Sequence, residues 1–225
     1  MPSTRTLPTT TDLRAYVVTG QGEPRRIIDV ARAAAAGGAG VVQVRSKPIS
    51  ARALTELAER VALAVAETNP RTRVLVDDRA DVAAALMRRG VPVHGAHVGQ
   101  DDLPVRDVRA LLGEHATIGL TTGTLELVRA VHDVADVVDY IGAGPFRPTP
   151  TKDSGRPPLG LAGYPPLVAE SPVPVVAIGD VTPADAADLA ETGVAGVAVS
   201  RGFMHASDPA AVARGILAGF GERRG

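Results

Sequence analysis

The sequence has no cysteine and few aromatic residues, and both shortages limit what the protein can be. Without cysteine the chain can have no disulfide, no thiolate metal ligand and no cysteine nucleophile, and this composition is typical of a cytoplasmic protein. Aromatic residues make up only 3% of the chain. Valine, leucine, isoleucine and alanine must therefore fill most of the core.

Net charge and long apolar runs are missing as well. The formal net charge of −1 gives no overall field that would attract nucleic acid or an anionic membrane. No apolar run approaches the roughly eighteen residues that cross a bilayer, and the first residues lack the apolar core of a secretory signal. We therefore expect a soluble protein without nucleic-acid or membrane partners, in which any anion binds locally.

What is present indicates one globular domain. The 225 residues are 45% hydrophobic and 22% charged, which is ordinary for a protein with a sizeable core. Residues 1–12 are polar and rich in proline and threonine, and are predicted to be a flexible tail. No change in composition divides the rest, so residues 13–225 are predicted to be a single catalytic domain.

Short β-type runs alternate with helical patterns along the chain. Strands are predicted at residues 15–19, 41–45, 73–78, 93–99, 117–121, 140–144, 174–179 and 194–200. Helices are predicted at residues 24–36, 50–65, 82–88, 105–112, 125–134, 167–170, 183–191 and 209–220. Ser50 and Asp81 are expected to be helix N-caps.

This alternation predicts an α/β fold, a closed (β/α)8 barrel or TIM barrel. A doubly wound open sheet is the alternative, but no Gly-x-Gly-x-x-Gly follows the first strand. In a (β/α)8 barrel the active site lies at the carboxyl ends of the strands. Polar residues at those ends are therefore the candidates for function.

The second predicted strand ends in an amide and two cations. Gln43, Arg45 and Lys47 share one direction, because side chains alternate along a strand. Such a row suits a polar ring beside a diphosphate. A solvated, charged strand end is the alternative.

Carboxylates follow the next two strands. Asp77 and Asp78 end the third strand, and Asp102 lies in the loop after the fourth. Oxygen ligands of this kind suit Mg2+, which commonly takes one or two carboxylates together with phosphate oxygens and water. Helix N-capping is the alternative role for Asp78 and Asp102.

The last two strands end in residues that suit a phosphate. Gly179 and Gly202 would permit close approach of a ligand to the backbone, and Ser200 and Arg201 can donate hydrogen bonds. Asp180 fits this interpretation poorly, because its carboxylate would repel a phosphate unless it points away.

A proline-rich loop follows the sixth strand. It carries two hydroxyls and a cation, Thr149, Thr151 and Lys152, which could bind a phosphate or diphosphate. A rigid surface turn is the alternative. The five histidines do not assemble: His94 and His97 are expected on opposite faces of one strand, although His97 could lie within the barrel or at its mouth.

Four segments in this order resemble thiamine phosphate synthase: Gln43 to Lys47, Val76 to Asp81, His97 to Pro104, and Gly144 to Lys152. The resemblance runs across roughly residues 15–220. It implies that 4-amino-2-methyl-5-hydroxymethylpyrimidine diphosphate is coupled to 4-methyl-5-hydroxyethylthiazole phosphate. In that family the diphosphate leaves first, and the thiazole nitrogen traps the resulting cation. Leaving-group stabilisation then matters more than a base.

The resemblance also implies a role for each matching position. Asp78 and Asp102 would bind Mg2+, while Lys152, Arg45 and Lys47 would be catalytic. The pyrimidine diphosphate would be bound by Gln43, Val44, Arg45, Ser46, Lys47, Asp77, Thr121 and Lys152. The thiazole phosphate would be bound by Thr149, Pro150, Thr151, Gly179, Asp180, Ser200 and Arg201.

The chain departs from the family at four positions. Asp77 replaces an asparagine, Thr121 a serine, Gly123 a histidine and Asp180 a glycine. One alternative is a thiazole tautomerase-like paralogue. The other is a non-catalytic barrel that binds a phosphorylated thiazole or thiamine, and only Asp77 and Asp180 favour it. The tautomerases lack the Thr-x-Thr-Lys loop and rely on the missing histidine, so the synthase is favoured.

A homo-oligomer is possible, and small phosphorylated molecules are the expected partners.

Overall fold

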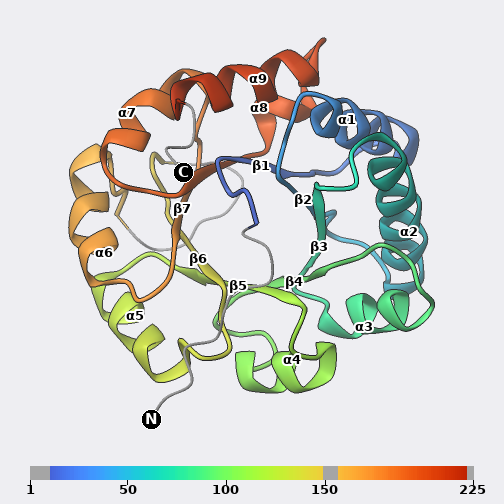
Figure 1. Ribbon diagram of the computed structural model, residues 1–225, viewed down its shortest axis with the longest axis horizontal. Coiled ribbons are helices and arrows are strands. Elements are labelled where there is room, and N and C mark those ends of the chain that lie inside the picture. Colours follow the sequence, from blue (N-terminus) through green and yellow to red (C-terminus); the bar gives the residue numbers. More distant parts are fainter. Residues whose placement is uncertain (1–10, 149–156, 222–225) are drawn as a thin grey trace.

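A computed structural model describes residues 11–148 and 157–221, and it contains a closed barrel of eight parallel strands in sequence order (Figure 1). This confirms the predicted TIM barrel. The strands are β1 (Ala15–Val18), β2 (Val41–Val44), β3 (Arg73–Asp77), β4 (Gly95–Val98), β5 (Thr117–Thr122), β6 (Tyr140–Ala143), β7 (Val175–Ile178) and β8 (Gly196–Val199).

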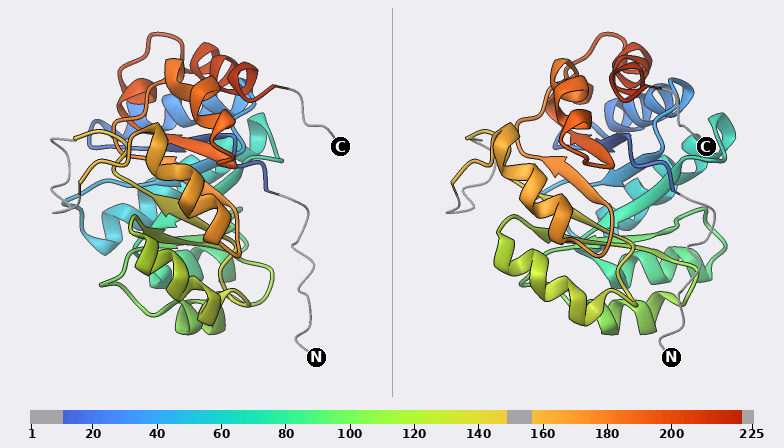
Figure 2. Two further views of the ribbon diagram at one scale, coloured as in Figure 1. Left: turned by 90° about the vertical axis from the view of Figure 1, so that its left-hand side faces the viewer. Right: turned by 60° about the vertical axis from the view of Figure 1, so that its left-hand side comes forward.

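Helices surround the barrel, and neighbouring helices lie side by side around it (Figures 1 and 2). The α-helices are α1 (Pro24–Ala36), α2 (Ala51–Thr68), α3 (Ala80–Arg88), α4 (Val105–Leu112), α5 (Leu125–Ala130), α6 (Tyr164–Glu170), α7 (Ala186–Glu191), α8 (Arg201–Met204) and α9 (Pro209–Gly219). Short 3-10 turns are η1 (Val131–Val134), η2 (Leu161–Gly163) and η3 (Pro183–Asp185). None of the described helices is long and apolar enough to cross a membrane.

Local differences from the predicted elements have physical reasons. Ser50 caps α2 as predicted, accepting a hydrogen bond from the Ala53 N–H. The prediction for Asp81 was wrong: it lies in the first turn of α3, where its carboxylate pairs with Arg79. The predicted helix 183–191 begins as a 3-10 turn, closed by a capping box between Thr182 and Asp185. The four-residue α8 is too short to give a periodic signal.

Alternation along the strands separates two apolar layers. Ala15 and Val17 on β1 pack outward against the helices, whereas Tyr16 and Val18 point into the barrel. The outer layer consists mainly of valine, alanine and leucine, as the low aromatic content predicted. The three tyrosines are all buried, and Tyr16 and Tyr140 lie inside the barrel. Two of the three tyrosines therefore lie in the barrel interior, whereas Tyr164 packs in the outer layer.

The predicted tail falls mainly on residues 1–10, which lie outside the described residues. Its flexibility, and the division of the chain at residue 13, remain predictions. Asp12 accepts hydrogen bonds from the backbone and guanidinium of Arg14. Leu13 is buried against the barrel interior. Packing against the barrel interior therefore begins at least two residues before β1.

A partly buried histidine lies at the opposite end of the barrel from the carboxyl ends of the strands. His94 precedes β4, and its Nδ1 accepts a hydrogen bond of 3.0 Å from the Val74 N–H. Desolvation, assisted by the nearby charge of Arg73, lowers the pKa of His94 to about 4. His97 lies inside the barrel instead, so the two histidines share no site, as expected.

Acidification should therefore destabilise the fold through His94. Because its folded pKa lies below the unfolded value near 6.5, its contribution is complete above pH 6.5 and is lost as the pH falls towards 4. The loss should be about 2–3 kcal/mol. His94→Asn keeps an acceptor for Val74 but cannot titrate, so its unfolding free energy should lack this pH dependence in denaturant titrations. His115→Asn, at an exposed histidine, should retain it; an equal slope in all three proteins would contradict the assignment.

Candidate active site

The polar row on β2 points into the barrel mouth and meets the carboxylates at the end of β3. The Gln43 amide donates to Asp77 Oδ1. Arg45 Nε and Lys47 Nζ lie 3.4 and 3.5 Å from Asp77 Oδ2, and Lys47 also forms an ion pair with Asp78. The predicted common direction of this row is confirmed. Two cations and two carboxylates thus meet where adjacent strands end.

Asp77 is the most buried charged residue of this cluster. Its Oδ2 is buried and accepts no hydrogen bond among the described residues, although both cations lie nearby. Burial raises the pKa of Asp77, and the charges of Lys47 and Arg45 together with the Gln43 hydrogen bond oppose that rise. Both adjacent carboxylates therefore have cationic partners.

Asp78 and Asp102 are held by backbone contacts at neighbouring strand ends. Asp78 has φ of 58° and its N–H donates to the His97 carbonyl at 2.7 Å. Asp102 Oδ2 accepts from the Gly99 N–H at 2.6 Å. Neither carboxylate caps a helix, since α3 and α4 begin after Arg79 and Pro104 without a side-chain cap. The capping alternative is therefore wrong for both.

A chain of polar side chains crosses the barrel interior behind this cluster. His97 on β4 lies 2.9 Å from both Thr121 Oγ1 and the Tyr140 hydroxyl. The Tyr140 and Tyr16 hydroxyls are 2.7 Å apart, and Tyr16 donates to Gln43 Oε1 at 2.6 Å. Sequence reasoning missed both tyrosines. The available signal was a tyrosine at an interior position of two strands in a chain poor in aromatics.

The ends of β6, β7 and β8 also meet. The Arg147 N–H donates to the Gly179 carbonyl at 3.0 Å, and its guanidinium binds both oxygens of the Asp185 carboxylate. Asp180, with φ of 58°, forms an ion pair with Arg201. Ser200 is the residue before α8 and makes no side-chain cap. The Asp180 carboxylate thus points towards Arg201, a residue that was predicted to bind the phosphate.

Four predicted residues, Thr149, Pro150, Thr151 and Lys152, lie outside the described residues. The described chain on either side of them is anchored beside β7. The Phe146 N–H donates to the Ile178 carbonyl at 2.9 Å, and the Leu159 N–H returns to the Pro145 carbonyl at 2.8 Å. A Cβ at Gly179, where φ is 98°, would overlap Pro145. Glycine is therefore required there for the close approach of these two segments.

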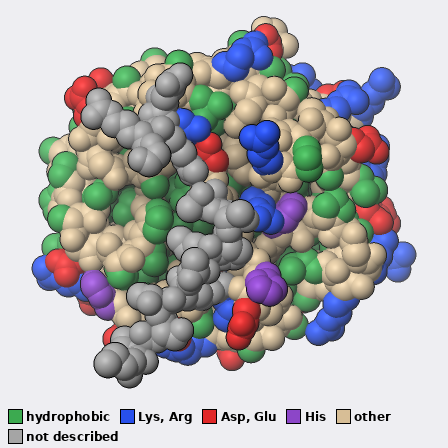
Figure 3. All heavy atoms as spheres, viewed as in Figure 1, with side chains coloured by type: hydrophobic (Ala, Val, Ile, Leu, Met, Phe, Trp, Pro, Cys, Tyr) green, Lys and Arg blue, Asp and Glu red, His purple; other side chains and the backbone are tan. Residues whose placement is uncertain are grey.

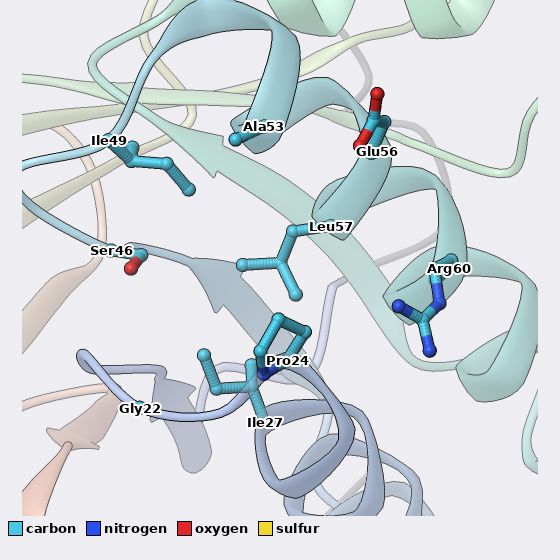
Figure 4. A pocket seen from close by; sticks show the side chains of 9 residues that line it. All are labelled: Gly22, Pro24, Ile27, Ser46, Ile49, Ala53, Glu56, Leu57 and Arg60. Carbon is cyan, nitrogen blue, oxygen red and sulfur yellow. The ribbon is translucent and has the colours of Figure 1, made fainter.

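Val44 and Ser46 point away from the mouth. Val44 is fully buried in the outer layer between sheet and helices. Ser46 lines a pocket of about 150 Å3 between α1 and α2, with apolar walls that include Ile27, Ile49 and Leu57 (Figure 4). Any contact between these two residues and a ligand at the mouth would use their backbone.

Surface charge is distributed as the net charge suggested. On the face shown in Figure 3, lysine and arginine side chains are interspersed with aspartate and glutamate. The described residues visible on this face form no extended patch of one sign. Among the described residues, no three His, Asp or Glu side chains are grouped as metal ligands. Any Mg2+ site there has at most two protein carboxylates, which is usual when substrate oxygens complete the shell.

A closed (β/α)8 barrel with cations and carboxylates gathered at the carboxyl ends of its strands belongs to the class of barrel enzymes, whose active sites lie at that mouth. More particularly, residues 15–203 match the thiamine monophosphate synthase family, and the chain belongs to this family. The resemblance seen in the motifs is thereby confirmed. The protein is an enzyme, a transferase of thiamine biosynthesis.

Individual relatives agree with this assignment. A thiamine-phosphate synthase from Corynebacterium efficiens is 67% identical over 215 residues, covering 96% of this chain and 98% of the relative. A thiamine-phosphate synthase from Anaeromyxobacter dehalogenans is 41% identical over 205 residues, covering 91% and 86%. The structure of a thiamine phosphate pyrophosphorylase from Pyrococcus furiosus superposes with a TM-score of 0.77 at 28% identity, covering 93% and 96%.

Proposed function

We propose that this enzyme couples 4-amino-2-methyl-5-hydroxymethylpyrimidine diphosphate to 4-methyl-5-hydroxyethylthiazole phosphate, giving thiamine phosphate and diphosphate. Family membership supports the reaction. The observation that carries the assignment of the site is the convergence of Arg45 and Lys47 on Asp77 and Asp78 at one mouth. A cytoplasmic location and a homo-oligomeric state remain predictions.

Arg45 and Lys47 are proposed to bind the diphosphate of the pyrimidine substrate. Arg45 is partly exposed and Lys47 is exposed, and the ion pairs with Asp77 and Asp78 hold both cations at the mouth. Negative charge grows on the diphosphate as its bond to carbon breaks, and preorganised cations stabilise that charge. Lys152 would act with them. This step requires no general base.

Asp78 and Asp102 are proposed to hold Mg2+. Both are oxygen ligands at the ends of adjacent strands, and neither is used as a helix cap. The Gly99 N–H orients Asp102, while Lys47 pairs with Asp78. When bound, Mg2+ would neutralise charge on the diphosphate. The donor set therefore fits the ion.

The thiazole phosphate is proposed to bind where β7 and β8 end, near Gly179, Ser200 and Arg201. Thr149 and Thr151 would complete this subsite. Asp180 already forms an ion pair with Arg201, one of the cations of this subsite. The phosphate would therefore have to compete with a carboxylate for this guanidinium.

Asp180→Gly should lower the KM for the thiazole phosphate severalfold. The substitution releases Arg201, and glycine readily adopts the left-handed conformation of this residue. Asp180→Asn tests charge alone, since asparagine tolerates the same conformation. Steady-state kinetics should show an unchanged KM for the pyrimidine diphosphate in both variants. Unchanged or weaker affinity for the thiazole phosphate would show that Asp180 does not compete.

The proposed reaction is tested by incubating the full chain with both substrates and Mg2+ and separating the products by chromatography. Thiamine phosphate and diphosphate should form in equal amounts, and neither should form when one substrate is omitted. Binding of the thiazole phosphate without any product would instead support the non-catalytic alternative. Isomerisation of a thiazole phosphate without coupling would support the tautomerase alternative.

A further inference from the structure

A row of hydrogen-bonded side chains inside the barrel links Thr121 and Gln43, two residues that the family resemblance assigns to the pyrimidine diphosphate. It runs from Thr121 on β5 through His97, Tyr140 and Tyr16 to Gln43 on β2. Each neighbouring pair is separated by 2.6–2.9 Å, within hydrogen-bond range. Members of this chain come from five of the eight strands, so it fixes side chains on opposite sides of the mouth relative to one another.

The barrel is built to accommodate this chain. A Cβ at Gly119 on β5 would overlap both the Tyr140 ring and His97 Nδ1, and one at Gly142 on β6 would lie 3.2 Å from His97 Cε1. Glycine at these positions makes room for the imidazole beside the phenol. The rings of His97 and Tyr140 are 5.5 Å apart between centroids. Tyr16, Tyr140 and His97 are all buried, so water does not compete for their hydrogen bonds.

The hydrogens of this chain can point in only one direction from Asp77 outward. Asp77 Oδ1 accepts from the Gln43 amide, which turns Gln43 Oε1 towards Tyr16. Tyr16 donates its single hydrogen to that oxygen, so its own oxygen must accept from Tyr140. Tyr140 has then used its hydrogen as well and must accept from His97 Nδ1–H.

The direction of these hydrogen bonds also determines how Thr121 donates and accepts at the mouth. With its proton on Nδ1, a neutral His97 accepts at Nε2 from the Thr121 hydroxyl. Thr121 is partly exposed and, having donated its hydrogen inward, offers only lone pairs to a ligand. Gln43 has the opposite character: the second hydrogen of its amide is not used by these bonds. One end of the chain therefore accepts and the other donates.

We propose that Tyr16, Tyr140 and His97 are positioning residues that fix this donor–acceptor pattern and so determine which heterocycle is accepted. This inference rests on the proposed function. Thr121 would accept from an exocyclic amine, and Gln43 would donate to a ring nitrogen. An aminopyrimidine carries both groups, whereas a hydroxypyrimidine would present its oxygen to the lone pairs of Thr121. Tyr16, Tyr140 and His97 would thus select the amine-bearing ring without touching it, because they act through Thr121 and Gln43.

Tyr140→Phe removes the central hydroxyl and leaves the ring in place. The KM for the pyrimidine diphosphate should rise about tenfold, as for a lost hydrogen bond, with a smaller change in kcat. The KM for the thiazole phosphate should not change. Tyr164→Phe is the matched control. Tyr164 is equally buried, but its hydroxyl donates to the Ala143 carbonyl and takes no part in the hydrogen-bonded row from Thr121 to Gln43. An equal rise in KM in both variants would overturn the proposal.

The tautomer of His97 provides a test that does not depend on turnover. Long-range 1H–15N spectra of the full chain at neutral pH should show His97 with its proton on Nδ1, and its signals should be identified by their loss in His97→Gln. Tyr140→Phe should shift the tautomer, whereas Tyr164→Phe should not. A proton on Nε2, or on both nitrogens, would overturn the inferred direction even if the coupling reaction is confirmed. The Nδ1 tautomer in an inactive protein would instead contradict only the proposed function.

Discussion

Asp78→Asn is expected to lower kcat/KM at limiting Mg2+ by at least about a hundredfold, or roughly 3 kcal/mol of transition-state stabilisation. The substitution removes one of two proposed anionic ligands and also the partner of Lys47. Asparagine tolerates the φ of 58° at this position, so the backbone should be retained. Raising the Mg2+ concentration should restore part of the activity, because the defect is in metal affinity.

Asp81→Asn is the matched control for this experiment. Asp81 lies three residues further along, is exposed, and pairs with Arg79 rather than with a residue of the mouth. Titrations of Mg2+ against turnover should give the same half-saturation for this variant and the unchanged chain. If Asp78→Asn also retains that half-saturation, Asp78 does not bind the metal.

Arg109→Met should destabilise the fold by about 3–5 kcal/mol, since it breaks a buried ion pair by removing one partner. Arg109 on α4 is buried and lies 2.8 Å from Asp139 Oδ2. Its guanidinium also donates to the carbonyls of Val137 at 2.9 Å and Ala116 at 2.7 Å. These acceptors precede β5 and β6, so the arginine joins the ends of the barrel remote from the mouth.

Arg106→Met is the control on the same helix. Arg106 is exposed and pairs with Asp136, which is also exposed, so chemical denaturation should show little change in stability. At temperatures where Arg109→Met remains folded, its kcat and KM should match those of the unchanged chain. An Arg109→Met variant that is as stable as Arg106→Met would contradict the buried role.

The barrel could be predicted from sequence because its signals are local and repeated. Each buried strand is a short apolar run, and Ser50 marks the start of α2 with its own hydroxyl. Asp81 shows the limit of such reasoning, because a neighbouring Arg79 gave the carboxylate another partner. Cap preferences describe only what a side chain can do, and competition between partners decides what it does.

The part of the candidate site that could be predicted from sequence is the part in which alternation along a strand sets the direction of the side chains. Gln43, Arg45 and Lys47 converge because they occupy alternate positions. The ion pair of Asp180 with Arg201 could not be predicted, since it depends on how two loops approach each other. Tyr16 and Tyr140 were missed because they read as apolar members of their strands. Their hydroxyls acquire a role only once the barrel closes.

The most direct measurement is a crystal structure of the full chain with Mg2+ and the pyrimidine diphosphate. The diphosphate should lie within hydrogen-bond distance of Arg45 and Lys47, with the metal between Asp78 and Asp102. Electron density for the diphosphate elsewhere, for example in the pocket between α1 and α2, would contradict the account.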